Sequence, residues 1–194
     1  MVPSPIAVTL KVTAILEELH VPYFIGGSVA STLYGMVRTT QDSDLIADLR
    51  SEHIRPLALA LEGEFFIDPE LVTDAVARRA SFNIIHRESM FKVDVFIPRE
   101  TAFIKNQFAR ARREILSADP EARAYVATAE DVLLAKLDWY RLGGESSERQ
   151  WRDVLGVLKL QADTLDRDYL RRMAEELKVG VLLDLALSEA RPRE

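Results

Sequence analysis

Two hydrophobic patterns divide the chain, and the change between them constrains the fold more than any other feature. Up to about residue 127, short β-branched and aromatic runs alternate with segments of helical period, whereas only helical patterns follow. Thr128 with Asp131 three residues later resembles a capping box, with Asp in place of the usual Glu or Gln, and a capping box marks a helix start. We therefore expect an α+β fold, with a mixed β-sheet core flanked by helices over residues 1–127 and a C-terminal helical bundle over residues 128–194.

The expected elements follow from these patterns together with the Gly, Pro and capping signals between them. Helices are predicted over residues 6–19, 28–34, 52–61, 69–78, 100–109, 129–141, 148–160, 166–177 and 181–190. Strands are predicted over residues 23–25, 45–49, 81–86, 91–97, 114–116 and 124–127, the last two as short edge strands. Ser28 is the natural N-cap of the second helix.

Composition excludes several classes of site. The chain has no cysteine, so disulfides, thiolate zinc sites and cysteine nucleophiles are absent. His20, His53 and His86 lack zinc-ligand spacing and are expected to be structural or exposed. No apolar run approaches the roughly 20 residues that cross a bilayer, and residues 1–11 lack the pattern of a secretory signal. We expect a cytoplasmic protein with no membrane partner.

The net charge of -6 disfavours nonspecific binding of nucleic acid. A local exception is the basic stretch from Arg99 to Arg113, which contains a single acid, Glu100. This stretch is either the solvated face of a helix or a surface for a triphosphate or polynucleotide.

Three carboxylates are the main candidates for chemistry. Asp42 and Asp44 are two residues apart and directly precede a predicted strand. Their side chains therefore point to one face, while that of Ser43 points away. Two carboxylates held this close repel each other unless a cation lies between them. Asp94 interrupts an apolar strand, and if that strand lies beside the first, the three acids could hold two metal ions about 4 Å apart. The alternatives are a solvated acidic loop and a half-exposed strand.

A glycine turn stands upstream of these acids. Phe24-Ile25-Gly26-Gly27-Ser28 reads as a strand, a glycine pair and a helix start. Glycines let the backbone approach a ligand closely, and a helix N-terminus offers free N–H groups to an anion. The turn matches neither the dinucleotide nor the Walker fingerprint, because no lysine follows and no G-x-G-x-x-G is present.

The order strand, Gly-Gly-Ser, helix, Asp-x-Asp, strand and a later Asp on another strand resembles the nucleotidyltransferase superfamily that includes DNA polymerase beta and kanamycin nucleotidyltransferase. More narrowly, Gly26 to Gly35 followed by Arg38-Thr39-Thr40-Gln41-Asp42-Ser43-Asp44 looks like the AbiEii-type abortive-infection toxins and the minimal bacterial nucleotidyltransferases. The resemblance covers residues 20 to 100 well, and extends more loosely to Lys136 and the Arg152-Asp153 pair.

The resemblance implies a role for each matching residue. Asp42 and Asp44 would bind two Mg²⁺ ions, with Mn²⁺ able to substitute, and Asp94 would bind the catalytic ion. The turn Gly26-Gly27-Ser28 would bind the nucleotide. Two further nucleotide-binding residues would be Arg38 and Lys136.

Some of these roles have alternatives. Lys136 lies on an apolar helical stripe, where a lysine either extends to solvent or serves a site. Arg38 would orient the Asp-x-Asp loop or bind substrate, and otherwise is a solvated loop residue. Arg152-Asp153 is by default a surface ion pair.

The implied activity is the transfer of a nucleoside monophosphate from a nucleoside triphosphate to a hydroxyl. The acceptor would be an RNA end such as that of tRNA, a protein side chain or a small molecule. A toxin held in check by an antitoxin partner is one biological setting. The alternative is a catalytically silent protein of the same fold that binds a nucleotide or a partner.

Overall fold

The structure is a computed structural model that describes residues 3–35, 40 and 42–190. The described chain forms two compact units. The first contains the residues up to Ser28 and those from residue 40 to Val126, and the second contains residues 29–35 and those from Ala127 onward. The second unit therefore takes up residues 29–35, which chain order alone would assign to the β-sheet core.

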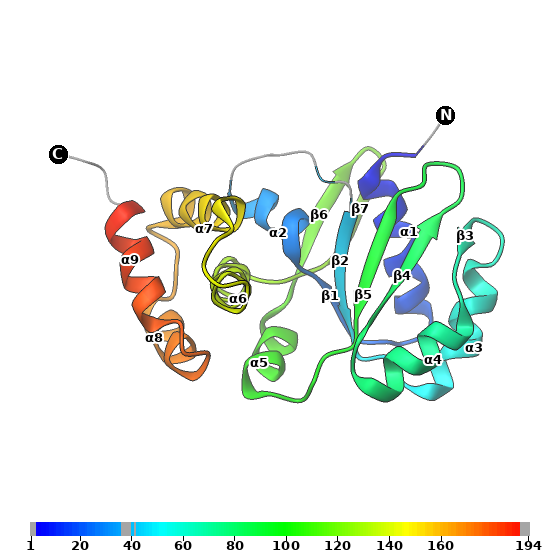
Figure 1. The fold of residues 1–194 in the computed structure, drawn as a ribbon. Helices are drawn as coiled ribbons and strands as arrows, with labels where there is room; N and C mark the ends of the chain where they lie inside the picture. Colours follow the sequence, from blue (N-terminus) through cyan, green and yellow to red (C-terminus); the bar gives the residue numbers. More distant parts are fainter. Residues whose placement is uncertain (1–2, 36–39, 41, 191–194) are drawn as a thin grey trace. The chain divides into compact units, whose positions relative to one another are not determined.

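A mixed seven-stranded sheet forms the centre of the first unit, in the order β3-β4-β5-β2-β1-β7-β6 (Figure 1). The strands are β1 (Tyr23–Ile25), β2 (Asp42–Ala47), β3 (Phe65–Phe66), β4 (Ser81–His86), β5 (Lys92–Phe96), β6 (Arg112–Ala118) and β7 (Glu121–Val126). Strand β2 runs parallel to β5 and antiparallel to β1, while β1 runs parallel to β7. The predicted α+β class with a mixed sheet is confirmed.

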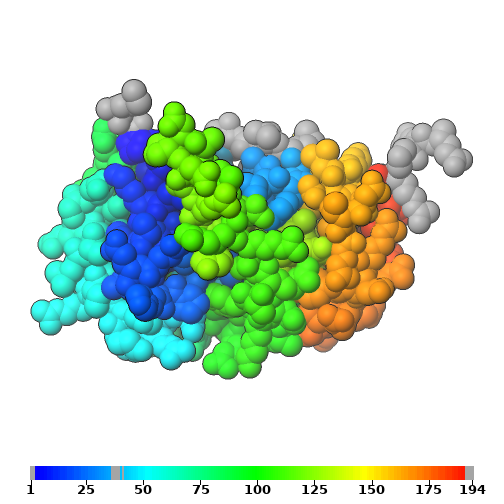
Figure 2. Space-filling model, turned by 180° about the vertical axis from the view of Figure 1, so that it is seen from behind, coloured from blue at the N-terminus to red at the C-terminus, as the bar shows by residue number. Residues whose placement is uncertain are grey.

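One face of the sheet is closed by helices. Ser43, Leu45 and Ala47 of β2 and Val93 and Val95 of β5 are buried on this face, as the period of two requires. Helices α1 (Pro5–Glu18), α3 (Ser51–Leu61) and α4 (Pro69–Arg78) belong to the same unit. Seen from behind, α1 lies between the α3 and α4 residues and the β6–β7 hairpin (Figure 2).

The opposite face of the sheet carries polar side chains at one end. Along β2 it presents Asp42, Asp44 and Ile46, all of intermediate exposure. Toward the other end of these strands, helix α5 (Ala102–Arg110) covers the face through Phe108, whose ring lies edge-on to that of Phe24 at 5.1 Å. The face is therefore apolar at the α5 end and acidic at the other.

The structure corrects several predicted boundaries. Strand β2 begins at Asp42 and ends at Ala47, so the acidic triplet lies inside a strand predicted to span 45–49. Strand β7 is interior, between β1 and β6, rather than at the edge. Helix α2 (Gly27–Tyr34) begins one residue before Ser28, which is thus in its first turn rather than its N-cap. The two-residue strand β3 was too short to predict.

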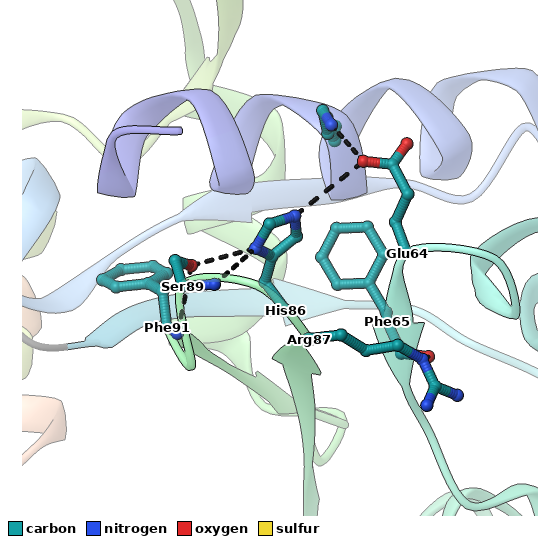
Figure 3. Close-up of polar contacts among 7 residues, drawn as sticks. Glu64, Phe65, His86, Arg87, Ser89 and Phe91 are labelled. Carbon is teal, nitrogen blue, oxygen red and sulfur yellow. Dashed lines mark hydrogen bonds and ion pairs between the residues drawn. The ribbon is translucent and has the colours of Figure 1, made fainter. Parts of the chain in front are cut away.

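The turn between β4 and β5 is held by His86 (Figure 3). Its Nδ1 accepts the backbone N–H of Ser89 at 3.2 Å, so the other ring nitrogen carries the proton and faces Glu64 at 3.8 Å. Glu64 also pairs with Lys11 of α1. Among the described residues His86 is therefore structural, and its contacts fix the point at which β5 begins.

Helices alone build the second unit in the described chain, namely α2 from Val29 onward, α6 (Ala129–Leu142), α7 (Glu148–Gln161), α8 (Arg167–Glu176) and α9 (Gly180–Ala190). Thr128 caps α6 as predicted, with its hydroxyl accepting the N–H of Asp131. Asp131 is fully buried and accepts the hydroxyl of Tyr169 at 2.6 Å, which ties α6 to α8. No described helix is long and apolar enough to span a membrane.

Tyr23 gives the first unit a pH-dependent contact. Its buried hydroxyl donates to Glu17 at 2.7 Å, and burial together with this carboxylate raises the pKa of Tyr23 above its ordinary value. Folding therefore favours the protonated phenol. This contribution is fully present below the unfolded tyrosine pKa of about 10 and is lost as pH rises beyond it.

We expect Tyr23→Phe to lose about 1 kcal/mol of unfolding free energy at pH 7, because Glu17 loses its donor. Above about pH 10 the wild-type protein should lose stability with pH more steeply than this variant. Urea unfolding at a series of pH values from 7 to 11 measures both effects. Equal alkaline slopes in the two proteins would contradict the assignment.

Candidate active site

Asp44 and Asp94 lie side by side on neighbouring strands. In the parallel ladder of β2 and β5, Asp44 is the direct partner of Asp94, and Asp42 is the partner of Lys92. Adjacent strands are about 4.8 Å apart, and residues two apart share a face. The register therefore gathers Asp42, Asp44, Asp94 and Lys92 on one face of the sheet, the juxtaposition on which the sequence interpretation depends.

Both oxygens of Asp94 are engaged by the protein. Lys92 Nζ lies 2.9 Å from Oδ2. Asn83, the ladder partner of Asp94 on β4, donates to Oδ1 of Asp94 at 2.8 Å when the amide is oriented with its nitrogen toward the acid. Asp94 is thus held from both sides, by a charged and by a neutral donor.

The three acids together affect the pKa of Lys92. The hydrogen bond that Lys92 donates to Asp94, followed by the charges of Asp94, Asp42 and Asp44, raises the pKa of Lys92 above its ordinary value against the opposing effect of burial. All three carboxylates are therefore close enough to act on a single ammonium group.

Thr40 supports the start of β2. Its hydroxyl donates to the backbone carbonyl of Asp42 at 2.8 Å and lies 3.1 Å from Oδ1 of the same residue. Between the acids, Ser43 points to the opposite, fully buried face, as predicted. The Ser43 hydroxyl has no hydrogen-bond partner in the described part of the chain.

The glycine turn touches the acidic face. The N–H of Gly26 donates to the carbonyl of Asp44 at 2.9 Å, which continues the pairing of β1 with β2. Gly27 has a φ of +54°, and a Cβ built on it would lie only 1.7 Å from Oδ2 of Asp44. Asp44 fills the space that a side chain at residue 27 would need. Ser28 follows at once and is largely buried.

Lys136 has a partner within its own unit. On α6, it is largely buried, and its Nζ donates to Asp153 of α7 at 2.8 Å, with 10% and 12% of the two side chains exposed. Asp153 is thus a half-buried ion-pair partner, whereas Arg152 is exposed and lies 3.8 Å from Glu148. Nucleotide binding by Lys136 stays a prediction. Arg38 lies outside the described residues.

The three carboxylates are ligands of the kind that a hard divalent ion prefers. Three carboxylates on one sheet face are the oxygen ligands that Mg²⁺ prefers, and they already attract one cation, the Lys92 ammonium. As the side chains stand, no three acids or histidines among the described residues converge on the position of a single ion. Rearrangement of Asp94 and Lys92 would therefore accompany ion binding.

Sequence patterns did not single out Asn83, Thr40 or Lys92 as part of this site. Asn83 enters only through the antiparallel pairing of β4 with β5. Thr40 acts through its hydroxyl on Asp42. Lys92 shares a face with Asp94 through the period of two along β5, but a solvated strand face explains such a lysine equally well.

Solved structures of nucleotidyltransferase-like proteins share this fold. An antigenic nucleotidyltransferase-like protein from Paracoccidioides brasiliensis matches with a TM-score of 0.55 at 15% identity, over 95% of this chain and 92% of its own. ANT(2")-Ia, solved in complex with adenylyl-2"-tobramycin, matches with a TM-score of 0.53 at 13% identity, over 89% of this chain and 96% of its own. No model of a protein family matches the sequence, and no curated protein is significantly similar to it. The chain has the nucleotidyltransferase fold.

Proposed function

We propose that this protein is a metal-dependent nucleotidyltransferase that moves a nucleoside monophosphate from a nucleoside triphosphate to a hydroxyl acceptor. The observation that carries the proposal is the placement of Asp44 directly beside Asp94 and beneath the Gly27 turn. This arrangement puts paired carboxylates, which can hold cations, next to a backbone turn that can approach phosphates.

Different residues of the chain would bind the metal ions and the nucleotide. Asp42, Asp44 and Asp94 would hold two Mg²⁺ or Mn²⁺ ions, which supply charge neutralisation for the phosphates and a lowered pKa for a bound hydroxyl. The N–H groups at the start of α2, with Ser28, would bind the triphosphate. Lys136 and Arg38 are the further candidates for nucleotide binding.

The reaction breaks one phosphoanhydride bond. The acceptor oxygen forms a bond to the α-phosphorus, the bond to the β-phosphate oxygen breaks, and pyrophosphate leaves with the electron pair. The proton of the acceptor hydroxyl needs a base, and Asp94 would accept it. Two donors now occupy the oxygens of Asp94, so at least one must leave before that step.

Turnover of nucleotide tests the proposal. The wild-type protein would be incubated with each α-labelled nucleoside triphosphate, Mg²⁺ or Mn²⁺, and three acceptor pools: tRNA, cell protein and aminoglycosides. The last pool is included because ANT(2")-Ia was solved with an adenylylated tobramycin. We expect release of pyrophosphate and label transfer to one pool, both lost in Asp42→Ala/Asp44→Ala.

A matched control is Asp74→Asn. Asp74 is an exposed acid on α4 paired with Arg78, so its loss should leave turnover unchanged. Indistinguishable turnover in wild type and the double variant would overturn the proposal. Nucleotide binding without product for any acceptor would favour the catalytically silent alternative.

The resemblance to AbiEii-type toxins motivates one biological proposal, that the protein arrests growth unless an antitoxin partner restrains it. Expression in a bacterial host should then slow growth, and Asp44→Asn should relieve the arrest. Equal growth with wild type and variant would exclude this setting while leaving the transfer reaction intact.

A further inference from the structure

The acidic face contains a cation supplied by the chain itself. Lys92 and Asp94 point to the same side of β5, and their charged atoms are 2.9 Å apart. Lys92 is also the ladder partner of Asp42 on β2. Its ammonium therefore lies among the carboxylates proposed as metal ligands, rather than at a separate place on the surface.

The two donors on Asp94 differ in how readily they can leave. Asn83 is short, and its backbone is paired with Asp94 in the β4–β5 ladder. Lys92 has a long flexible side chain, of which 39% is exposed, against 15% for Asp94. Release of the lysine therefore needs only rotation of its side chain, whereas Asn83 can keep the carboxylate oriented.

We propose that Lys92 is a tethered counter-ion that occupies the divalent-ion position at Asp94 until nucleotide arrives. An ion binding to Asp94 must displace the ammonium, because both cations need the same oxygen. The triphosphate is the anion that the proposed reaction brings to this face, and its phosphates would receive the displaced lysine. The inference rests on the proposed function and makes Lys92 a positioning residue for it.

This arrangement couples the two ligands. A free protein that must break an ion pair binds divalent ions weakly, while nucleotide lowers that cost by accepting Lys92. By linkage, the ion strengthens nucleotide binding by the same factor. Removal of the lysine charge should therefore tighten ion binding to the free protein and weaken the coupling.

The test measures Mn²⁺ binding by electron paramagnetic resonance, with and without a non-hydrolysable triphosphate. We expect Lys92→Gln to bind Mn²⁺ about 10-fold more tightly than wild type without nucleotide, and to lose most of the nucleotide-induced gain. Lys92→Arg keeps the charge and should behave like wild type. Lys159→Gln removes the same charge from an exposed lysine on α7, and should change neither quantity.

The outcomes separate this inference from the proposed function. Mn²⁺ affinity that Lys92→Gln leaves within about twofold of wild type would overturn the inference alone, since charge loss at a competing cation must change the affinity. A gain reproduced by Lys159→Gln would also overturn it, because net charge would then explain the effect. Absence of Mn²⁺ binding in every protein, with and without nucleotide, would overturn the proposed function as well. Circular dichroism checks that each variant is folded.

Discussion

Asp44→Asn is expected to lower the rate of nucleotidyl transfer by about 1,000-fold or more while leaving the fold intact. Asp44 contacts both the glycine turn and β5. Gly27 lies against its carboxylate, and Asp94 is its ladder partner. An amide at this position keeps the shape but removes the charge that two divalent ions would share. Loss of such charge stabilisation in a catalytic site costs several kcal/mol.

Stability should move in the opposite direction. Asp44 and Asp94 are like charges directly opposite each other, and such pairs destabilise a sheet by up to about 1 kcal/mol. In the absence of divalent ions, Asp44→Asn should therefore be as stable as wild type or slightly more stable. Pyrophosphate release and urea unfolding in a chelating buffer measure the two effects.

The combination distinguishes a functional from a structural acid. If the role of Asp44 were structural, the variant protein would have a lower free energy of unfolding. Its activity would then fall only in proportion to the folded fraction. A variant that is unstable without metal would therefore contradict the role proposed for this residue. Asp74→Asn, at the exposed acid on α4 that pairs with Arg78, provides the comparison for a charge change outside the proposed site.

Local sequence patterns predicted much of the fold because they depend on residues close in the chain. Alternation along residues 42–47 places Asp42 and Asp44 on one face and Ser43 on the buried face, and the structure has this arrangement. The cap at Thr128 and the helices that follow also depend on local hydrogen bonds and helical period.

Strand boundaries were less accurate because a partner strand decides them. The sequence predicts a strand only from Leu45, where the apolar run begins. In the structure β2 extends back to Asp42, since Lys92, Val93 and Asp94 of β5 provide ladder partners for its first three residues. Acidic residues have low intrinsic strand propensity, and here tertiary pairing outweighs it.

The site required contacts that no local pattern contains. Asp44 and Asp94 were expected to meet only if their strands were neighbours, and that adjacency is a property of the sheet order. Asn83 reaches Asp94 from a third strand. The ion pair of Lys136 with Asp153 likewise joins two helices, so an apolar stripe around the lysine could not reveal its partner.

Gly27→Ala is expected to lower the rate of transfer by as much as Asp44→Asn does. Unlike Asp44→Asn, it should also destabilise the first unit. An alanine Cβ would lie 1.7 Å from Oδ2 and 2.5 Å from Cγ of Asp44, so the carboxylate must leave its place. The φ of +54° adds backbone strain of about 1 kcal/mol for a residue with a side chain. Pyrophosphate release and urea unfolding again provide the measurements.

Gly144→Ala separates the two causes. Gly144 has a φ of +69°, yet a Cβ there would meet nothing within 4 Å. It should therefore show the cost of a left-handed backbone, about 1 kcal/mol, without loss of transfer. The difference in unfolding free energy between the two glycine variants then measures the clash with Asp44. That difference should shrink strongly when Gly27→Ala is made in an Asp44→Gly background, because the three atoms nearest to the new Cβ are then gone. An undiminished difference in that background would show that Gly27 is required for a reason other than its contact with the carboxylate.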